Sequence, residues 1–196
     1  MQHLLTPQGT KREPFAWWEG AFTAEELDWL QGKAKEATQE ALVGGTGSGS
    51  GSVNPELRRS ELSWLSNDKD SRWVFEKLSH VVSSLNAEYF GFNLLGFGEK
   101  LQLTNYHENK QGMYGWHQDF GGAGPSRKLS VAVQLSDPSE YEGGNLEILT
   151  SGKPTAMSRE RGLITVFPAW TLHQVTPVVK GTRQSLVTWV SGEPFR

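Results

Sequence analysis

The strongest chemical pattern in this sequence lies at residues 114–120, which read Tyr-Gly-Trp-His-Gln-Asp-Phe. His117 and Asp119 are two residues apart, and side chains at that spacing leave the same face of an extended strand. His173 lies 56 residues further along the chain and can supply a third ligand from another strand. Two imidazoles and one carboxylate on one face, with open positions opposite, form the facial triad that holds Fe(II) in non-haem oxygenases.

A His-x-Asp pair is a weak signal by itself, because the same pair is common in solvated turns. The context strengthens it. Arg183 follows His173 by ten residues, and Ser185 lies two residues further on, so both share one face of a strand. A guanidinium group is the preferred bidentate partner of a carboxylate. The sequence therefore offers metal ligands together with a cation for an acidic cosubstrate.

Five segments resemble the core of the prolyl 4-hydroxylase-like branch of the Fe(II)/2-oxoglutarate dioxygenases, in the same order. They are LQLTNY at 101–106, YGWHQD at 114–119, YEGGNL at 141–146, FPAWTLHQVTPV at 167–178 and GTRQS at 181–185. The resemblance covers about residues 95 to 191, half of the chain. It implies that His117, Asp119 and His173 bind Fe(II), and that 2-oxoglutarate and O2 take the remaining positions as cosubstrates. Ascorbate is a further candidate cofactor.

The resemblance also implies a binding site for 2-oxoglutarate. Arg183 matches the cation that binds the far carboxylate of this cosubstrate, and Ser185 can donate a hydrogen bond to the same group. Tyr106 matches the strand tyrosine that contacts the cosubstrate, although an ordinary core tyrosine explains that residue equally well. Gln134 could face the same pocket, by strand alternation alone.

Aromatic residues beside the metal ligands are candidate substrate contacts. Tyr114, Trp116 and Trp170 flank the ligands and can form walls for the substrate, with ordinary packing as the equal alternative. The segment 121–125, Gly-Gly-Ala-Gly-Pro, follows the first two ligands directly and is interpreted as a loop at the site entrance, with a lid as one role.

The implied reaction is hydroxylation of an unactivated C–H bond, with release of succinate and CO2. The substrate is a prolyl or other peptidyl residue, or a free amino acid. Asp119 argues against halogenation, because the related halogenases have Gly or Ala at the carboxylate position.

Two alternatives stay open: a non-catalytic jelly-roll binding protein with a vestigial metal site, and a zinc hydrolase with the same ligands. The intact ligands and Arg183 oppose the first, and the absence of a general-base Glu beside a ligand opposes the second.

Composition limits the remaining classes of function. The 196 residues suit one domain, 1–196, with 1–95 as a helical support and 96–196 as the catalytic core. A net charge of −3 gives no electrostatic footprint for nucleic acid. The lack of cysteine fits a cytoplasmic protein, and neither a signal peptide nor an apolar run of membrane-spanning length is evident. Nothing in the sequence indicates an oligomeric state, and the expected partners are the small-molecule cosubstrate and a peptidyl or small-molecule substrate.

The expected fold class is mainly β with flanking helices (α+β), built on a double-stranded β-helix (jelly roll) core with N-terminal helices packed on one face. A capping box at Thr23 and Glu26 starts a helix that we expect over about 24 to 42. A second amphipathic helix is expected over about 71 to 89. Strands are placed near 98–107, 113–119, 128–136, 145–149, 162–167, 172–179 and 183–191.

Two further segments lie before the strands. The Gly/Ser tract 44–52 has the composition of a flexible linker, or of a loop that becomes ordered on substrate binding. Residues 58–65 are predicted to form one strand that begins with two arginines. We interpret Arg58 and Arg59 as a solvated edge in preference to a contact with an acidic or peptide substrate.

Overall fold

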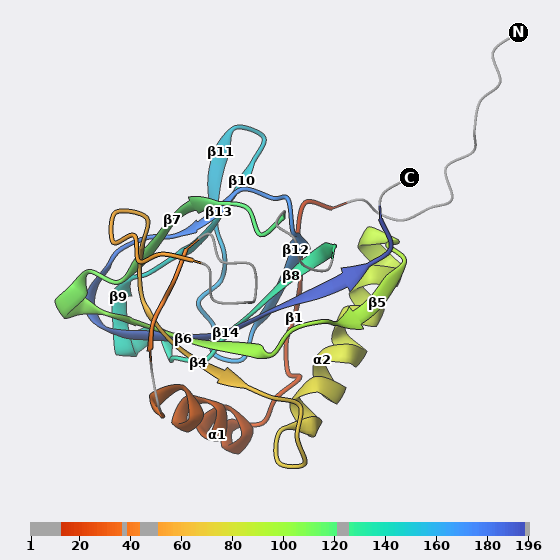
Figure 1. The fold of residues 1–196 in the computed structure, drawn as a ribbon, viewed down its shortest axis with the longest axis horizontal. Coiled ribbons are helices and arrows are strands. Elements are labelled where there is room, and N and C mark those ends of the chain that lie inside the picture. The colour runs from red at the N-terminus through yellow and green to blue at the C-terminus, as the bar shows by residue number, and fades with distance from the viewer. Residues whose placement is uncertain (1–12, 37–38, 44–50, 121–125, 195–196) are drawn as a thin grey trace, which may run out of the picture.

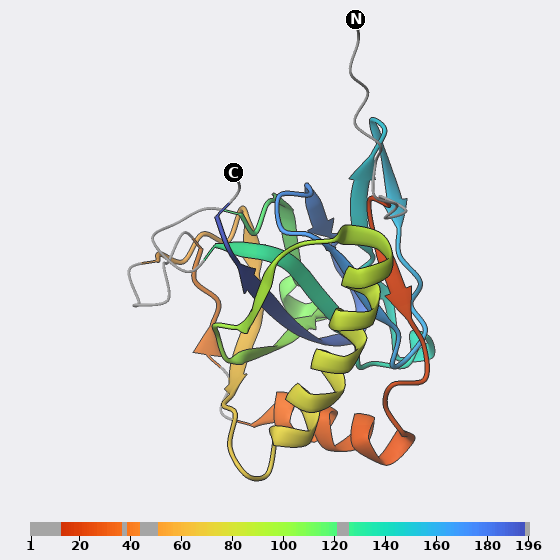
Figure 2. The ribbon, with the colours of Figure 1, turned by 90° about the vertical axis from the view of Figure 1, so that its right-hand side faces the viewer.

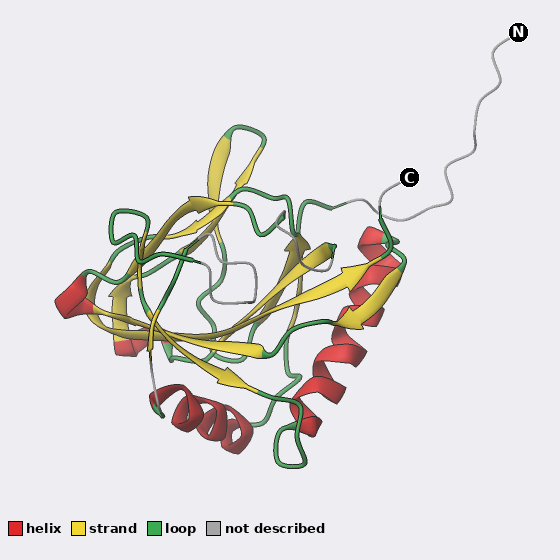
Figure 3. Ribbon diagram, in the orientation of Figure 1, coloured by secondary structure: helices red, strands yellow, loops and turns green. Residues whose placement is uncertain are grey.

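The computed structural model describes residues 13–36, 39–43, 51–120 and 126–194, and it shows a jelly roll of two antiparallel sheets (Figures 1 and 3). The larger sheet has the order β1-β12-β8-β14-β6-β4-β2, with β5 and β9 also paired to β14. The smaller sheet has the order β11-β10-β13-β7-β3. The fold class predicted from the sequence is confirmed.

The bounds of the strands are as follows. The larger sheet contains β1 (Ala16–Trp18), β2 (Gln39–Glu40), β4 (Glu61–Leu65), β5 (Leu94–Phe97), β6 (Leu101–His107), β8 (Arg127–Gln134), β9 (Tyr141–Gly143), β12 (Ile164–Pro168) and β14 (Val178–Gly192). The smaller sheet contains β3 (Arg58–Arg59), β7 (Met113–His117), β10 (Leu146–Thr150), β11 (Lys153–Ala156) and β13 (His173–Val175). The part of the chain before residue 96 thus contributes strands to both sheets, in addition to its two helices.

Both helices, α1 (Ala24–Lys35) and α2 (Arg72–Leu85), pack on the outer side of the larger sheet (Figure 2). The main apolar core lies between them and this sheet, and it includes Leu30, Leu78, Leu103, Val133 and Leu186, all at most 1% exposed. Strand β8 separates this core from the interior of the jelly roll. Leu129 and Val133 lie in the core, whereas the alternate residues Ser130 and Ala132 line a cleft between the sheets.

Helix α1 begins where the capping box predicts. The Thr23 hydroxyl accepts from the Glu26 backbone N–H at 3.3 Å, and the Glu26 carboxylate accepts from the Thr23 N–H at 2.8 Å. The helix ends at Lys35, so the prediction of a helix to residue 42 is wrong. Glu36 is extended, with ψ of 142°, and β2 pairs with β4. Hydrogen bonding to a sheet edge therefore replaces the last helical turns. Helix α2 continues into a π-helical turn at Asn86–Phe90, which agrees with the predicted second helix.

The predicted strand 58–65 is divided between the two sheets. β3 pairs with β7 in the smaller sheet, β4 pairs with β6 in the larger sheet, and Ser60 lies between them. The chain therefore crosses from one wall of the jelly roll to the other at this point. Within the described ranges, none of the helices combines the length and the apolar character that crossing a bilayer requires.

Candidate metal centre and cleft

Strand register brings the three predicted metal ligands together. His173 of β13 lies directly opposite His117 of β7. Asp119 follows the end of β7, where its backbone N–H donates to the Ala169 carbonyl at 2.9 Å. One ligand atom from each of the three side chains lies within 4.8 Å of the others. The Nε2 atoms of His117 and His173 are 3.8 and 3.4 Å from the Asp119 carboxylate oxygens. This separation suits three ligands that converge on one cation.

Local hydrogen bonds fix the direction of each ligand. The Nδ1 atoms of His117 and His173 lie 2.8 and 2.9 Å from the carbonyl oxygens of Gly115 and Thr171. A carbonyl oxygen can only accept, so Nδ1 carries the proton and Nε2 is left as the ligand atom. The Ser130 hydroxyl donates to Asp119 Oδ2 at 2.6 Å, which orients the carboxylate.

Electrostatics set the protonation states of these groups. Burial lowers the pKa of the His117 imidazole to about 4, and the neighbouring His173 adds to this effect. Burial alone would raise the pKa of Asp119, but His173, His117 and the hydrogen bond from Ser130 lower it below its ordinary value. At neutral pH the site thus presents a neutral His117 imidazole and an anionic carboxylate, the states in which these groups bind metal. This donor set fits a divalent cation such as Fe(II).

A β-bulge places Tyr114 beside the metal ligands. His173 pairs with His117 but Val175 pairs with Tyr114, so β7 has one extra residue over this interval. The Tyr114 ring stacks on the His117 ring, with centroids 3.4 Å apart and planes 13° apart, and it lines the cleft.

The other two predicted wall residues lie elsewhere. The side chains of Trp116 and Trp170 are 36% and 37% exposed, and neither lines the cleft. Trp170 instead makes edge contacts with the rings of Phe92 and Phe120.

A cleft of about 1070 Å³ connects the metal ligands with Arg183. Its walls include Tyr106, Arg183 and Ser185, which are 3%, 4% and 1% exposed. Arg183 of β14 pairs with Tyr106 of β6, and its Cζ lies 5.5 Å from the centroid of the Tyr106 ring. Arg183 Nη1 lies 3.5 Å from Ser185 Oγ. Among the described residues, Arg183 forms no ion pair with a carboxylate, so this buried cation suits an external anion.

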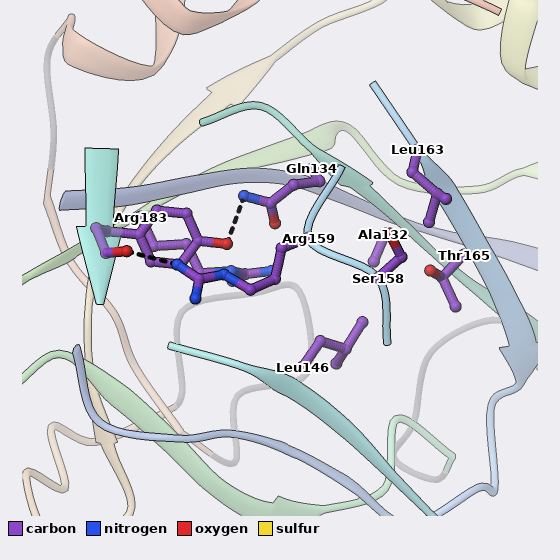
Figure 4. A pocket seen from close by; sticks show the side chains of 9 residues that line it. Ala132, Gln134, Leu146, Ser158, Arg159, Leu163, Thr165 and Arg183 are labelled. Carbon is purple, nitrogen blue, oxygen red and sulfur yellow. Dashed lines mark hydrogen bonds between the residues drawn. The ribbon is translucent and has the colours of Figure 1, made fainter. Parts of the chain in front are cut away.

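A smaller pocket lies behind Arg183 (Figure 4). Gln134 is located there, where its amide donates to the Tyr141 hydroxyl at 3.1 Å. Arg159 lies over the Tyr141 ring, with its Cζ 4.1 Å from the ring centroid. Gln134 lines this pocket and not the cleft, whereas Arg183 borders both, so a role for Gln134 beside the cosubstrate stays a prediction. Sequence reasoning missed Arg159, because it lies in a charged loop with no distinguishing pattern.

The sequence interpretation of the arginine pair is wrong for one member. Arg58 is buried and lines the cleft, whereas Arg59 donates to the backbone carbonyls of Lys110, Gln111 and Pro55. Sequence reasoning also missed Arg127, which lines the cleft. Its guanidinium forms a bidentate pair with Glu99, at 2.7 and 2.6 Å.

Two predicted mobile features fall wholly or partly outside the described residues. The predicted entrance loop 121–125 is outside them, as are residues 44–50 of the Gly/Ser tract. At the end of that tract, Gly51 lines the cleft and Ser52 forms a β-bridge with Val43.

Comparison with known proteins agrees with the geometry. The family model of the 2OG-Fe(II) oxygenase superfamily matches residues 101–191, which include all three candidate ligands and Arg183. A PKHD-type hydroxylase of Teredinibacter turnerae is 35% identical over 173 residues, which cover 85% of this chain and 68% of that protein. A second PKHD-type hydroxylase, of Synechococcus sp., is 45% identical over 80 residues, which cover 39% of this chain. The matched segment spans only 36% of the length of that second relative.

A solved structure has the same fold. It is a prolyl hydroxylase from Trichoplax adhaerens in complex with a peptide fragment of the hypoxia inducible factor oxygen degradation domain. The two structures superimpose with a TM-score of 0.72 over 91% of this chain and 84% of that one, at 16% sequence identity. At this identity the likeness is one of fold.

Proposed function

Because the chain belongs to the 2OG-Fe(II) oxygenase superfamily, we propose that it is an Fe(II)- and 2-oxoglutarate-dependent hydroxylase that uses O2. Its substrate is an unactivated C–H bond of a prolyl or other peptidyl residue, or of a free amino acid, and it releases succinate and CO2. The observation that carries the proposal is the single cleft that joins a His-Asp-His ligand set to a buried arginine without a carboxylate partner among the described residues.

In this proposal His117, Asp119 and His173 hold Fe(II), which with 2-oxoglutarate and O2 supplies the oxidising power that C–H hydroxylation needs. The role of the chain's own residues is to position the ligand atoms and to enclose the reacting groups in the cleft. The carbonyls of Gly115 and Thr171 keep both Nε2 atoms directed inward. With three ligands from the protein, a bound ion would have coordination positions left for the cosubstrates.

Arg183 binds the far carboxylate of 2-oxoglutarate. The guanidinium cannot lose its proton under physiological conditions, so its burial is stabilised by an anion that enters the cleft. Ser185 and Tyr106 line the same part of the cleft, where a hydroxyl can donate to that carboxylate. Gln134 lies behind and holds Tyr141, which bounds the smaller pocket.

The nature of the metal ligands favours hydroxylation over halogenation, because Asp119 occupies the position that a halide would need. The names of the relatives support a hydroxylase, and the prolyl hydroxylase of similar fold was solved with a peptide. A peptidyl substrate is therefore one of the two classes to test, and a free amino acid is the other.

The first experiment measures succinate formed from 2-oxoglutarate with Fe(II) and O2, first without substrate and then with amino acids and proline-containing peptides. We expect slow succinate formation alone and faster formation with a true substrate, inhibition by N-oxalylglycine, and loss of turnover in Asp119→Ala. Omission of ascorbate shows whether the reaction requires it.

Iron binding with no succinate from any candidate would instead favour a non-catalytic binding protein. Insensitivity to N-oxalylglycine, with activity retained under anaerobic zinc, would favour a hydrolase.

A further inference from the structure

Arg58 is a second buried cation in the cleft, and no function above uses it. It is 7% exposed. Its Nε donates to the Ser60 hydroxyl at 2.9 Å, and its Cζ lies 4.5 Å from the centroid of the Tyr114 ring. Within the described part of the chain, Arg58 forms no ion pair with Asp or Glu. A buried guanidinium without an anion is costly, which points to an anionic partner from outside the protein.

The neighbouring arginines show why Arg58 is distinct. Arg127 also lines the cleft, but Glu99 neutralises its charge. Arg183 has a role in the proposed function, at the far carboxylate of 2-oxoglutarate. Arg59, next in the chain, is directed to backbone carbonyls outside the cleft. Among the three of these arginines that line the cleft, Arg58 alone has neither a carboxylate partner among the described residues nor an assigned ligand.

The position of Arg58 relates it to the metal centre. The Tyr114 ring stacks on His117 and also carries the Arg58 guanidinium over its face. A carboxylate held by Arg58 would therefore lie one aromatic ring away from a metal ligand. A small molecule, or one side chain of a peptide, can span that interval and present a C–H bond at the metal.

We propose that Arg58 binds a carboxylate group of the primary substrate, an inference that rests on the proposed function. The two carboxylates of 2-oxoglutarate already have sites, one at the metal and one at Arg183. The anion at Arg58 therefore belongs to the molecule that is hydroxylated. It is either the α-carboxylate of a free amino acid or the acidic side chain of a peptide, because a bidentate guanidinium recognises both in the same way.

Paired probes test this proposal on the wild-type enzyme. Succinate formation is measured with each free amino acid and with its α-amide, and with tripeptides that carry Asp or Glu against the same tripeptides with Asn or Gln. We expect the carboxylate member of one pair to be preferred by about 30-fold or more in kcat/KM. The pair that shows the preference identifies the source of the carboxylate.

Two variants test whether Arg58 is responsible for the preference of acid over amide. Arg58→Met removes the guanidinium but keeps an apolar stem against Tyr114, and Arg59→Met is the matched control on the same strand. We expect Arg58→Met to lose the preference of acid over amide, with the KM for 2-oxoglutarate in substrate-free turnover changed by less than about threefold. Arg59→Met should keep the preference. Anaerobic titration calorimetry of acids and amides onto the protein with Fe(II) and 2-oxoglutarate gives the same comparison without turnover.

Several results would overturn the inference. They are equal use of acids and amides by the wild type, no binding of any carboxylate probe, or a preference that Arg58→Met retains. A KM for 2-oxoglutarate that rises tenfold or more in Arg58→Met would assign Arg58 to the cosubstrate. In each case succinate formation by the wild type, alone or with any candidate substrate, would leave the proposed function standing, and its absence under all of these conditions would count against that function.

Discussion

Each imidazole of the metal group is oriented by a carbonyl that lies two residues earlier in the chain, Gly115 for His117 and Thr171 for His173. The orientation is therefore local to each segment, and only the meeting of the two segments depends on the fold. The sequence could nominate the three candidate ligands from the His-x-Asp spacing together with the ordered segments around His173 and Arg183. It could not show that β7 and β13 place the two histidines directly opposite each other.

We expect His173→Ala to weaken Fe(II) binding at least tenfold and to abolish turnover, because two ligands rarely hold the ion. His80→Ala is the matched control, since His80 is exposed on α2 and contacts Trp18. Calorimetric titration with Fe(II) under anaerobic conditions measures the difference. Equal affinities in the two variants would remove His173 from the metal site.

Arg183→Ala should raise the KM for 2-oxoglutarate by about one to three orders of magnitude, because loss of one partner of a buried charge pair costs about 2–5 kcal/mol. Iron binding should persist, since no metal ligand changes. The KM of Arg183→Lys for 2-oxoglutarate should lie between those of the wild type and Arg183→Ala, because lysine keeps the charge but cannot form the bidentate hydrogen bonds of a guanidinium. Calorimetric titration with 2-oxoglutarate measures the affinities of the three proteins. An affinity of Arg183→Ala equal to that of the wild type would show that the cosubstrate pocket lies elsewhere.

The depressed pKa of His117 predicts how the metal-free protein responds to pH. Its pKa is about 4 in the folded protein, against 6.5 as the ordinary value. Between these values the unfolded chain binds more protons, so stability rises with pH and is lost on acidification from about pH 6.5 to 4. The loss from this group is on the order of 3 kcal/mol. Urea unfolding of chelator-treated protein at pH 7 and 4.5 should show it, with a smaller change in His117→Gln.

The secondary-structure elements could be predicted where a local sequence pattern decides them. The prediction failed where pairing with a distant strand decides them. The capping box fixed the start of α1, but helix propensity could not reveal that β2 pairs with β4 and ends the helix at Lys35. The division of 58–65 between two sheets was also hidden, and with it the burial of Arg58. The bulge in β7 likewise directs Tyr114 and His117 to one face, against simple alternation.

Within the elements, the same substitution should have opposite effects at two glycines. Gly32 is exposed in α1, and a Cβ there would meet nothing within 4 Å, so Gly32→Ala should stabilise the protein by about 0.5–1 kcal/mol. Gly181 in β14 has a φ of +73°, and a Cβ there would lie 2.0 Å from the Glu140 carbonyl oxygen. Gly181→Ala should therefore destabilise it by more than about 1–2 kcal/mol. Urea unfolding of both variants measures the free energies, and changes of equal sign would contradict this account.

At the scale of the whole molecule, the two sheets depend on different forces. The larger sheet shares an apolar core with both helices, whereas the candidate metal ligands lie at or just beyond the ends of β7 and β13 in the smaller sheet. Removal of Fe(II) should therefore speed hydrogen exchange in β7 and β13 and leave β8 and the centre of β14 protected. Mass spectrometry of the loaded and chelated protein measures this, and uniform acceleration in both sheets would show that they open as one unit.

The register of His117 opposite His173 has a consequence in polymer terms. An ion bound by both residues closes a ring of about 56 residues, and such a ring removes many conformations from the unfolded chain. In the chain-entropy description a permanent cross-link of that length would be worth about 4 kcal/mol. Bound iron would then act as a reversible cross-link between the two segments. Its removal by a chelator would resemble the reduction of a disulfide, in a chain that has no cysteine.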